Sequence, residues 1–183
     1  MDDYPRPDWR RRTTQQDPTD GNLGWQSLNQ VWAFAFDEAD VGLKEKWYER
    51  PAADRRTFPR EIRVPFAFQA KASGIGRREE SNVVWYVLDV ELSAGLFHEQ
   101  AYDQQVMLNF GAVDYEATVW SAGTQVGHHR GGHVPFQIDF TSQAAAAKAS
   151  AGPLNIVVRV EDRIQELSQP RGKQVSSITI ETP

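Results

Sequence analysis

Apolar and polar residues alternate with a period of two along most of this chain, and this alternation constrains the fold more than any other feature. In residues 83–92 the even positions from Tyr86 onward are apolar, whereas Asp89 and Glu91 lie between them. Such a pattern is typical of a strand with one buried face. Shorter runs of the same kind are Trp32–Phe34–Phe36, Ile62–Val64, Val106–Leu108–Phe110, Ala117–Val119, Ile156–Val158–Val160 and 177–182. We expect about nine strands in total.

Helical signals are confined to short inserts between these strands. Residues 41–48 are expected to form a turn or two, and the alanine-rich segment 142–149 is closed by the Gly-Pro pair at 152–153. No stretch alternates strands with long helices, so a parallel sheet is not expected. The chain is predicted to be all-β, an antiparallel two-sheet sandwich or jelly roll.

Turn residues refine this prediction at two places. Pro65 follows the Ile62–Val64 run, and because proline donates no ladder hydrogen bond, that strand should end there or lie at a sheet edge. A hairpin is predicted over 113–127 with its turn at Ala122 and Gly123. A type I′ turn needs positive φ at both central residues, which Ala122 would resist, so we expect a type I or II variant with Gly123 left-handed.

The length of 183 residues favours a single domain. Residues 1–30 are polar and interrupted by prolines and glycines, and we expect an extended arm packed on a domain formed by residues 31–183. Six Trp, five Tyr and nine Phe supply ample core material.

Composition argues against several classes of function. The chain has no cysteine, so disulfides and thiolate sites are excluded. The net charge of -5 has the wrong sign for binding phosphates, and we interpret the arginines at 10–12 as solvated, so no nucleic-acid partner is expected. The longest strongly apolar run is 31–36, too short for a membrane span. The polar start predicts no secretory signal in this chain, and neither the cytoplasm nor an exported compartment is favoured.

Several acidic pairs have a spacing that two-carboxylate catalysis could use, because side chains two residues apart on a strand lie about 6–7 Å apart. The groups are Asp89/Glu91, Asp114/Glu116, Asp37/Glu38/Asp40 and Glu161/Asp162. The solvent face of any strand produces such pairs, and we interpret them as solvated. Asp114/Glu116 differs in following a Gly-Ala bend that could re-aim a side chain.

Motifs for metals and cofactors are weak. His128, His129 and His133 lie in a glycine-rich connection without a carboxylate at ligand spacing, so no metal site is expected. No G-x-S-x-G motif occurs, and the glycines at 74 and 76 lack the third glycine and the helix of a dinucleotide loop. We therefore expect no cofactor.

Tryptophans offer a flat face on which a sugar ring can stack. Trp32, Trp85 and Trp120 lie on predicted strands and are expected in the core. The pair Trp47 and Tyr48, in a polar insert, is the one aromatic pair that we single out as a candidate for exposure.

A series of motifs, in order along the chain, carries a more specific signal. They are Tyr-Pro-Arg-Pro at 4–7, Trp-x-Ser-Leu-Asn-x-x-Trp-x-Phe-x-Phe-Asp at 25–37, Val-Pro-Phe at 64–66, Ser-Gly-Ile-Gly at 73–76, Val-Trp-Tyr at 84–86, residues 110–120, Gly123, 126–127, His129, 131–132, 135–136, 157–162 and Gln-Pro-Arg-Gly-Lys-Gln at 169–174. Together they resemble the opening domain of family 2 glycoside hydrolases, the β-galactosidase, β-glucuronidase and β-mannosidase group. The resemblance implies a jelly-roll, galactose-binding-domain-like β-sandwich that binds sugar.

The resemblance also implies that catalysis lies elsewhere. Family members hydrolyse with retention through two glutamates on a (β/α)₈ barrel, which needs about 250 further residues. We therefore expect no catalytic residue in this chain, no activity of the chain alone, and a catalytic barrel as its partner. The loops matched to the family motifs imply a set of sugar-binding or barrel-facing residues, which are Ser73, Gly74, Gly76, Arg171, Lys173 and Gln174.

Three functions follow from these observations and stay open at this point. The first is a non-catalytic sugar-binding domain of a family 2 β-glycosidase, with a β-galactoside, β-glucuronide or β-mannoside as the carbohydrate. The second is a free-standing carbohydrate-binding module or lectin. The third is a scaffold that binds a partner protein. An acidic sugar contact that the family carries after the 169–174 motif has no counterpart in residues 175–183.

Overall fold

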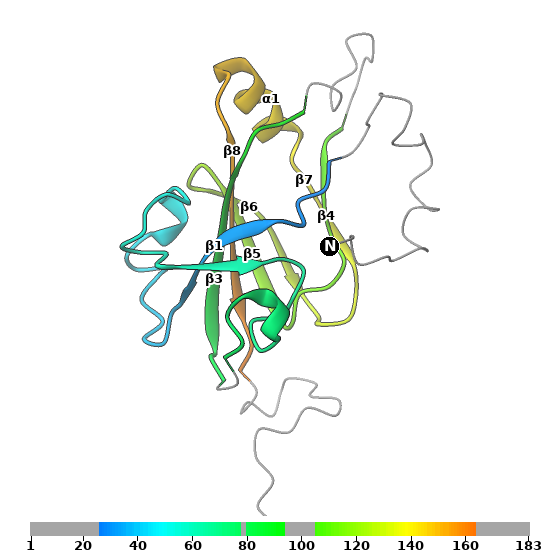
Figure 1. Ribbon diagram of the computed structural model, residues 1–183. Coiled ribbons are helices and arrows are strands. Elements are labelled where there is room, and N and C mark those ends of the chain that lie inside the picture. The colour runs from blue at the N-terminus through cyan, green and yellow to red at the C-terminus, as the bar shows by residue number, and fades with distance from the viewer. Residues whose placement is uncertain (1–25, 78–79, 94–104, 164–183) are drawn as a thin grey trace, which may run out of the picture.

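The computed structural model describes residues 26–77, 80–93 and 105–163, and the following account concerns these residues (Figure 1). Its elements, in chain order, are β1 Val31–Phe36, η2 Trp47–Glu49, β2 Arg60–Arg63, η3 Lys71–Ser73, β3 Val83–Val90, β4 Met107–Phe110, β5 Glu116–Ser121, β6 Thr124–Arg130, β7 Phe136–Asp139, α1 Thr141–Ser150 and β8 Leu154–Glu161. The predicted strand at 177–182 lies outside the described residues.

The strands form two antiparallel sheets. The larger sheet has six strands in the order β2-β1-β3-β8-β5-β6, and β4 pairs with β7 in a separate two-stranded sheet. All six strand pairings are antiparallel. In this part of the chain β2 is an edge strand that ends at Arg63, directly before the Val64-Pro65 pair, as proline requires. The predicted antiparallel β-sandwich is confirmed.

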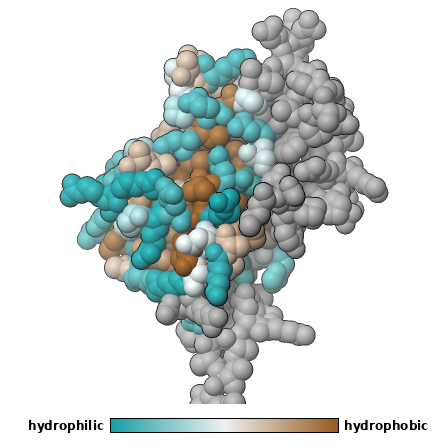
Figure 2. Space-filling model, viewed as in Figure 1, coloured by the Kyte–Doolittle hydropathy of each residue, from teal (hydrophilic) through white to brown (hydrophobic). Residues whose placement is uncertain are grey.

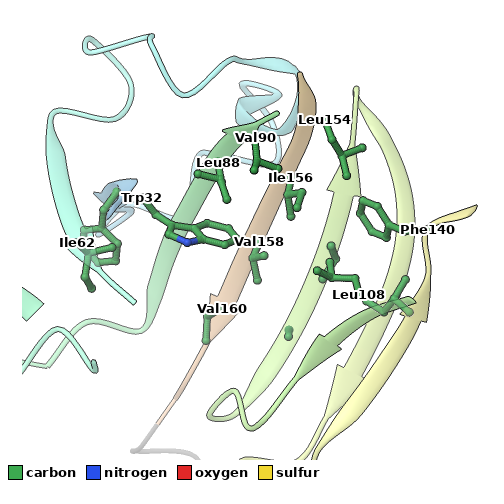
Figure 3. Close-up of a cluster of buried hydrophobic side chains, with 14 of the residues drawn as sticks. Trp32, Ile62, Leu88, Val90, Leu108, Phe140, Leu154, Ile156, Val158 and Val160 are labelled. Carbon is green, nitrogen blue, oxygen red and sulfur yellow. The ribbon is translucent and has the colours of Figure 1, made fainter. Parts of the chain in front are cut away.

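The main hydrophobic core lies between the two sheets. The apolar face of β3 and β8 carries Leu88, Val90, Ile156 and Val158, and Figure 3 shows them on the side where Phe140 and Leu108 approach. The remaining buried members are Trp32, Phe34, Ile62, Val84, Ala117, Val119, Ile138, Ala147, Leu154 and Val160. Most of these positions belong to the alternating runs of the sequence, so the face of each strand that meets this core was predicted correctly.

A second core covers the other face of the large sheet. The segment between β1 and β2 folds back over this face and buries Trp85 and Phe58 completely. Trp85 stacks on Trp120 with ring centroids 5.5 Å apart, and Tyr48 stacks on Trp120 at 5.3 Å. Trp32, Trp85 and Trp120 are buried as predicted. Trp47 and Tyr48, the candidate pair of exposed aromatic residues, are half-buried on this core.

Because both faces of the central strands are covered, these strands are apolar almost throughout. β3 and β8 pair along their whole length, from Val83–Glu161 to Val90–Leu154. Burial on both faces normally gives such near-continuous runs. The half-buried exceptions on β3 are Tyr86 and Asp89.

The helical inserts agree with the sequence in position. The α-helix Thr141–Ser150 corresponds to the predicted segment 142–149, buries Ala144 and Ala147, and ends at Ala151 in the left-handed region. Residues 41–48 form turns that lead into the short 3₁₀ helix at Trp47. No helix in the described residues has the length and apolar character needed to cross a bilayer.

The turn between β5 and β6 differs from the prediction. Ser121 pairs with Thr124, so Ala122 and Gly123 are the two central residues of a tight hairpin. Their φ angles are 46° and 79°. Positive φ at both positions is the type I′ turn, which matches the twist of the flanking strands. The expected type I or II turn was therefore wrong, because strand pairing overrides the preference of Ala122.

Residues 26–30 are the only described part of the predicted arm. The Gln26 side chain donates to the carbonyl of Glu91 at 2.9 Å and accepts from the amide of Ser93 at 2.9 Å. The carbonyl of Leu28 accepts from Trp32 Nε1 at 2.9 Å. These contacts join this segment to β1 and to the end of β3, whereas residues 1–25 lie outside the described part of the chain.

Candidate functional site

The predicted loop 73–76 belongs to a longer connection, residues 64–82, that runs from the edge strand β2 to the central strand β3. Figure 1 shows this connection at the end of the sheet opposite α1. The structure places Ser73, Gly74 and Gly76 here. The other predicted site residues, Arg171, Lys173 and Gln174, lie outside the described residues.

Ser73 holds the loop together from within. It is only 1% exposed, and its Oγ donates to the carbonyl of Ala70 at 2.7 Å while accepting from the amide of Ile75 at 3.1 Å. A hydroxyl with both roles occupied in this way shapes the turn. Ser73 is therefore a scaffold residue in this structure.

The two glycines present the backbone at the surface. Gly74 and Gly76 have φ of 87° and 65°, a region that favours glycine. Apart from Gly74 and its two neighbours in the chain, no atom of the described residues lies within 4 Å of the position that a Cβ on Gly74 would take, so there is space for a ligand at its backbone. Gly74 is the predicted residue whose surroundings fit direct contact best.

The loop is fixed to the sandwich by aromatic packing. Phe68 and Ile75 pack against the main core, and the ring of Phe68 meets Phe36 edge-on with centroids 5.3 Å apart. The carbonyl of Phe68 accepts from the amide of Arg77 at 3.2 Å, which closes the loop. The segment Ser73–Gly76 is therefore anchored to the main core through Phe68 and Ile75.

Two arginines lie over the ring of Phe36. The guanidinium carbon of Arg77 is 4.3 Å from the ring centroid, and that of Arg60 is 5.7 Å away. Arg77 also forms an ion pair with Glu38 at 2.7 Å. The sequence interpretation missed Arg60 and Arg77, since nothing local in the sequence shows which side chains meet over Phe36.

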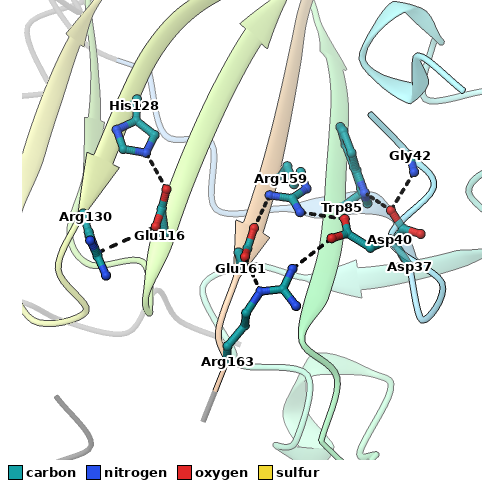
Figure 4. A network of polar contacts seen from close by, with 10 residues as sticks. All are labelled: Asp37, Asp40, Gly42, Trp85, Glu116, His128, Arg130, Arg159, Glu161 and Arg163. Carbon is teal, nitrogen blue, oxygen red and sulfur yellow. Dashed lines mark hydrogen bonds and ion pairs between the residues drawn. The ribbon is translucent and has the colours of Figure 1, made fainter. Parts of the chain in front are cut away.

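Asp37, interpreted from sequence as solvated, is in fact buried and structural. Its side chain accepts a hydrogen bond from the amide of Val41 at 2.8 Å. It also accepts from the amide of Gly42 at 2.8 Å and from Trp85 Nε1 at 3.0 Å (Figure 4). The residue is 3% exposed. The solvated interpretation was therefore wrong for Asp37.

Asp89 has a comparable structural role. It accepts from the amide of Ala52 at 2.8 Å and from the Asn155 side chain at 2.6 Å. It therefore ties the segment before β2 to β8, whereas its neighbour Glu91 is exposed as predicted.

Asp40 and Glu161 form a charge-balanced network with Arg159 and Arg163 (Figure 4). Arg159 contacts Asp40 at 2.7 Å and Glu161 at 2.5 Å, and its side chain is only 8% exposed. Burial alone would raise the pKa of Asp40, but the hydrogen bonds and charges of Arg159 and Arg163 outweigh it and leave that pKa below its usual value. The pKa of Glu161 is lowered by the same balance of causes.

The histidines of the predicted 127–133 cluster point to different partners. His128 Nε2 lies 2.8 Å from Glu116, which also faces Arg130 at 3.8 Å (Figure 4). His129 stacks on Phe136 with ring centroids 4.1 Å apart. Within the described ranges, no three acidic, histidine or cysteine side chains are grouped closely enough to hold a metal ion.

A hollow of about 320 Å³ lies beside Asp89, on the face of β1 and β2 that points away from Phe36. Its polar rim is formed by Arg55 and Glu61, which pair with each other at 2.5 Å. Asp89 already accepts two hydrogen bonds and Arg55 pairs with Glu61, so these charged groups at the hollow already have partners. The loop at 73–76 with the arginines over Phe36 is the better candidate site.

Comparison with known proteins points to the same family as the motifs. The model of the glycosyl hydrolases family 2 sugar binding domain matches residues 25–165. The curated β-glucuronidase of Paenibacillus borealis is 27% identical over 123 residues, which are 67% of this chain and 19% of that protein. The β-glucuronidase of Felis catus is 28% identical over 137 residues, which are 73% of this chain and 20% of that protein.

Solved structures give the same result. The β-glucuronidase of Ruminococcus gnavus in complex with D-glucaro 1,5-lactone has a TM-score of 0.59 and 25% identity, covering 75% of this chain and 21% of that chain. The β-glucuronidase of Lactobacillus rhamnosus has a TM-score of 0.58 and 27% identity, with the same coverage. This chain spans about a fifth of the length of these relatives. Since the family model covers most of the chain and the fold agrees, the chain belongs to the sugar-binding domains of glycoside hydrolase family 2.

Proposed function

We propose that this domain supports the sugar pocket of a β-glucuronidase-type enzyme whose catalytic groups lie on a barrel domain outside these residues. The relatives reported above are β-glucuronidases, and they are about five times as long as this chain. A glucuronide is therefore the first choice of carbohydrate, ahead of a β-galactoside or a β-mannoside. The family match over residues 25–165 carries this proposal.

The state of the acidic residues supports a non-catalytic role. Retaining hydrolysis uses two carboxyl groups about 5–5.5 Å apart, one of which must hold a proton near neutral pH. Asp37 and Asp89 are occupied by hydrogen-bond donors, and Glu161 is paired with arginines. A lowered pKa keeps Asp40 and Glu161 ionised, which is the wrong state for a general acid.

The loop 73–76 is our proposed contribution to the pocket rim. In this role Ser73 shapes the turn, and the backbone at Gly74 and Gly76 faces the sugar or the barrel. Arg171, Lys173 and Gln174 are proposed as a second contributing loop, with hydrogen bonds to sugar hydroxyls or ion pairs to barrel carboxylates. No cofactor is part of this proposal.

The purified chain is tested in two ways: the rate of substrate hydrolysis is measured, and the residues that respond to a bound sugar analogue are located. We expect no release of p-nitrophenol from p-nitrophenyl β-D-glucuronide above the blank rate. We also expect D-glucaro 1,5-lactone to shift the amide resonances of Gly74 and Gly76, with a smaller effect from the corresponding galactose-derived lactone. Turnover that disappears on changing Asp114 or Glu116 to Ala would contradict the non-catalytic role.

The same titration separates the alternative functions. Binding that leaves 73–76 unaffected but is millimolar or tighter would favour a free-standing carbohydrate-binding module or lectin. Self-association that grows with concentration, without any sugar response, would favour a scaffold that binds a partner protein.

A further inference from the structure

We propose that the segment between β1 and β2, residues 38–58, is an acid-sensitive strap that opens from the second core before the sandwich unfolds. Its two ends are held next to each other, because Phe34 on β1 pairs with Arg60 on β2. The strap is therefore a side excursion between two paired strands, and it can leave the sheet while the strand pairing remains. This conformational step goes beyond the proposed function and does not depend on it.

The strap covers the second core with one apolar side. Phe58 is completely buried, and Trp47 and Ala52 pack against this core. The ring centroid of Trp47 lies 5.8 Å from that of Trp85. In Figure 2 hydrophilic residues (teal) predominate at the left of the molecule, where Figure 1 places the strap. Apolar packing does not titrate, so any effect of acid on the strap has to come from its polar contacts.

Carboxylates of the sandwich hold backbone amides of the strap. Asp37, at the end of β1, accepts from the amides of Val41 and Gly42, both at 2.8 Å. Asp89 on β3 accepts from the amide of Ala52 at 2.8 Å. These two acids therefore fix the strap near its start and in its second half.

A third acid, Asp40, belongs to the strap and reaches the end of β8. It contacts Arg159 at 2.7 Å and Arg163 at 2.9 Å, and Glu161 binds the same two arginines (Figure 4). Burial would raise the pKa of Asp40, but the two arginines outweigh it and hold that pKa below its usual value. These pairs therefore stabilise the closed strap above the usual pKa and are lost as the pH falls through the lowered one.

Two further ion pairs lie near the ends of the strap. Glu38 pairs with Arg77 at 2.7 Å, and Arg55 pairs with Glu61 on β2 at 2.5 Å. Both acids are more than half exposed, so each pair adds little by itself. They nevertheless contain a carboxylate each, as do the contacts of Asp37, Asp40 and Asp89.

Acid therefore acts on the strap more than on the central strands. A protonated carboxyl loses its charge, and hydrogen bonds to a charged group are roughly twice as strong as neutral ones. β3 and β8 instead pair through their backbones from Val83–Glu161 to Val90–Leu154, and backbone groups do not titrate. Segments of a folded protein can open with a free energy of their own, below that of global unfolding.

Hydrogen exchange of the purified full chain, followed by NMR, tests this step. Protection factors are measured between about pH 6 and 3 against the rates of unprotected amides at the same pH. We expect the protection of the Val41, Gly42 and Ala52 amides to fall about fivefold or more beyond any loss in β3 and β8. The amides of Trp47 and Phe58 donate to carbonyls within the strap, and they should lose protection together with the others.

Matched variants assign the effect to the carboxylates. Asp89→Asn removes the charge that holds the amide of Ala52, so the protection of the strap amides should fall about fivefold near pH 6 and depend less on pH. Glu45→Gln is the control, because Glu45 belongs to the strap but accepts from Trp47 Nε1 within it at 3.0 Å. It should change neither quantity. Preserved protection in the remainder of β3 and β8 shows that each variant is folded.

Three outcomes would overturn this inference. Parallel loss of protection in the strap and in β3 and β8 would mean that the domain opens as one unit. Equal effects of Asp89→Asn and Glu45→Gln would mean that the loss of any charge on this side explains the result. Strap amides whose protection stays constant down to about pH 3 would show that no carboxylate holds the strap. None of these outcomes bears on sugar binding at residues 73–76.

Discussion

Asp37 is the residue on which the turn after β1 depends. Its carboxylate accepts three hydrogen bonds from Val41, Gly42 and Trp85 in a site that is 3% exposed. Asp37→Ala leaves three donors without an acceptor, and each buried unsatisfied donor costs roughly 1–3 kcal/mol. We expect the free energy of unfolding to fall by about 3 kcal/mol or more, measured by urea denaturation.

A conservative variant and an exposed control sharpen this test. Asp37→Asn keeps one acceptor oxygen but turns an amide donor toward another donor, so its loss should be smaller than that of the alanine variant. Glu91→Ala removes an exposed acid and should change the free energy by less than about 0.5 kcal/mol. Equal stability of Asp37→Ala and Glu91→Ala would show that Asp37 is solvated after all.

Between elements, Asp40 and Glu161 join the turn after β1 to the end of β8 through Arg159 and Arg163. The pKa values of both acids are lowered in the folded protein, against the opposing effect of burial. A lowered folded pKa means that the stabilisation is fully present above the unfolded pKa and is lost as the pH falls through the folded one. Stability should therefore decrease as the pH is lowered below about 4.5.

The variant Asp40→Asn tests this pH dependence. Asp40 has φ of 50°, and asparagine tolerates that region well, so the change removes the charge without adding backbone strain. We expect a loss of about 1 kcal/mol at neutral pH and a shallower fall of stability between about pH 5 and 3. Glu91→Gln is the control and should leave the dependence of stability on pH unchanged. If Asp40→Asn also leaves it unchanged, the ion pairs of Asp40 add nothing to the stability of the fold.

The hairpin between β5 and β6 carries a strained residue that can be relieved. Ala122 occupies the left-handed region with φ of 46°, which costs an ordinary residue roughly 1–2 kcal/mol. Ala122→Asn creates the Asn-Gly pair that type I′ turns prefer, and we expect a gain of about 1 kcal/mol in urea denaturation. Ala112→Asn, at an exposed position without positive φ, should change little. Destabilisation by Ala122→Asn would contradict the I′ geometry.

The sequence predicted the elements that depend on local patterns, and it did not predict those that depend on contacts between distant residues. Alternation is a local property, so the strands and their buried faces were predicted correctly, as at Leu88 and Ile156. Whether Trp47 is covered depends on a partner far along the chain, Trp85, with its ring centroid 5.8 Å away. The second core was therefore missed, and so was the positive φ of Ala122, which strand pairing imposes.

At the scale of the whole molecule, the candidate site could also be predicted only in part from the sequence. The motif at 73–76 resembled a family loop and led to Gly74, but the burial of Ser73 and its bond to Ala70 could not be predicted from the motif. Arg60 meets Arg77 over Phe36 only because β2 pairs with β1 in one particular register. That register is a property of the assembled sheet.

The closing of the sandwich depends on one close approach between its layers. Gly127 on β6 faces Ile138 on β7, and a Cβ at Gly127 would lie nearest to Cδ1 of Ile138, 2.7 Å from its Cγ1 and 3.0 Å from its Cγ2. Gly127→Ala therefore overpacks the contact and should cost about 1–3 kcal/mol. Ile138→Val should cost about 0.5–1.5 kcal/mol by leaving a small cavity. Valine lacks Cδ1, the Ile138 atom nearest to the new methyl group, so the double variant relieves the closest contact. Its loss of stability should therefore be about 1 kcal/mol smaller than the sum of the two single losses. Ile62→Val, at the opposite edge of the sheet, is the control and should be additive with Gly127→Ala. If urea denaturation finds both pairs additive, the β6 and β7 layers do not touch at Gly127.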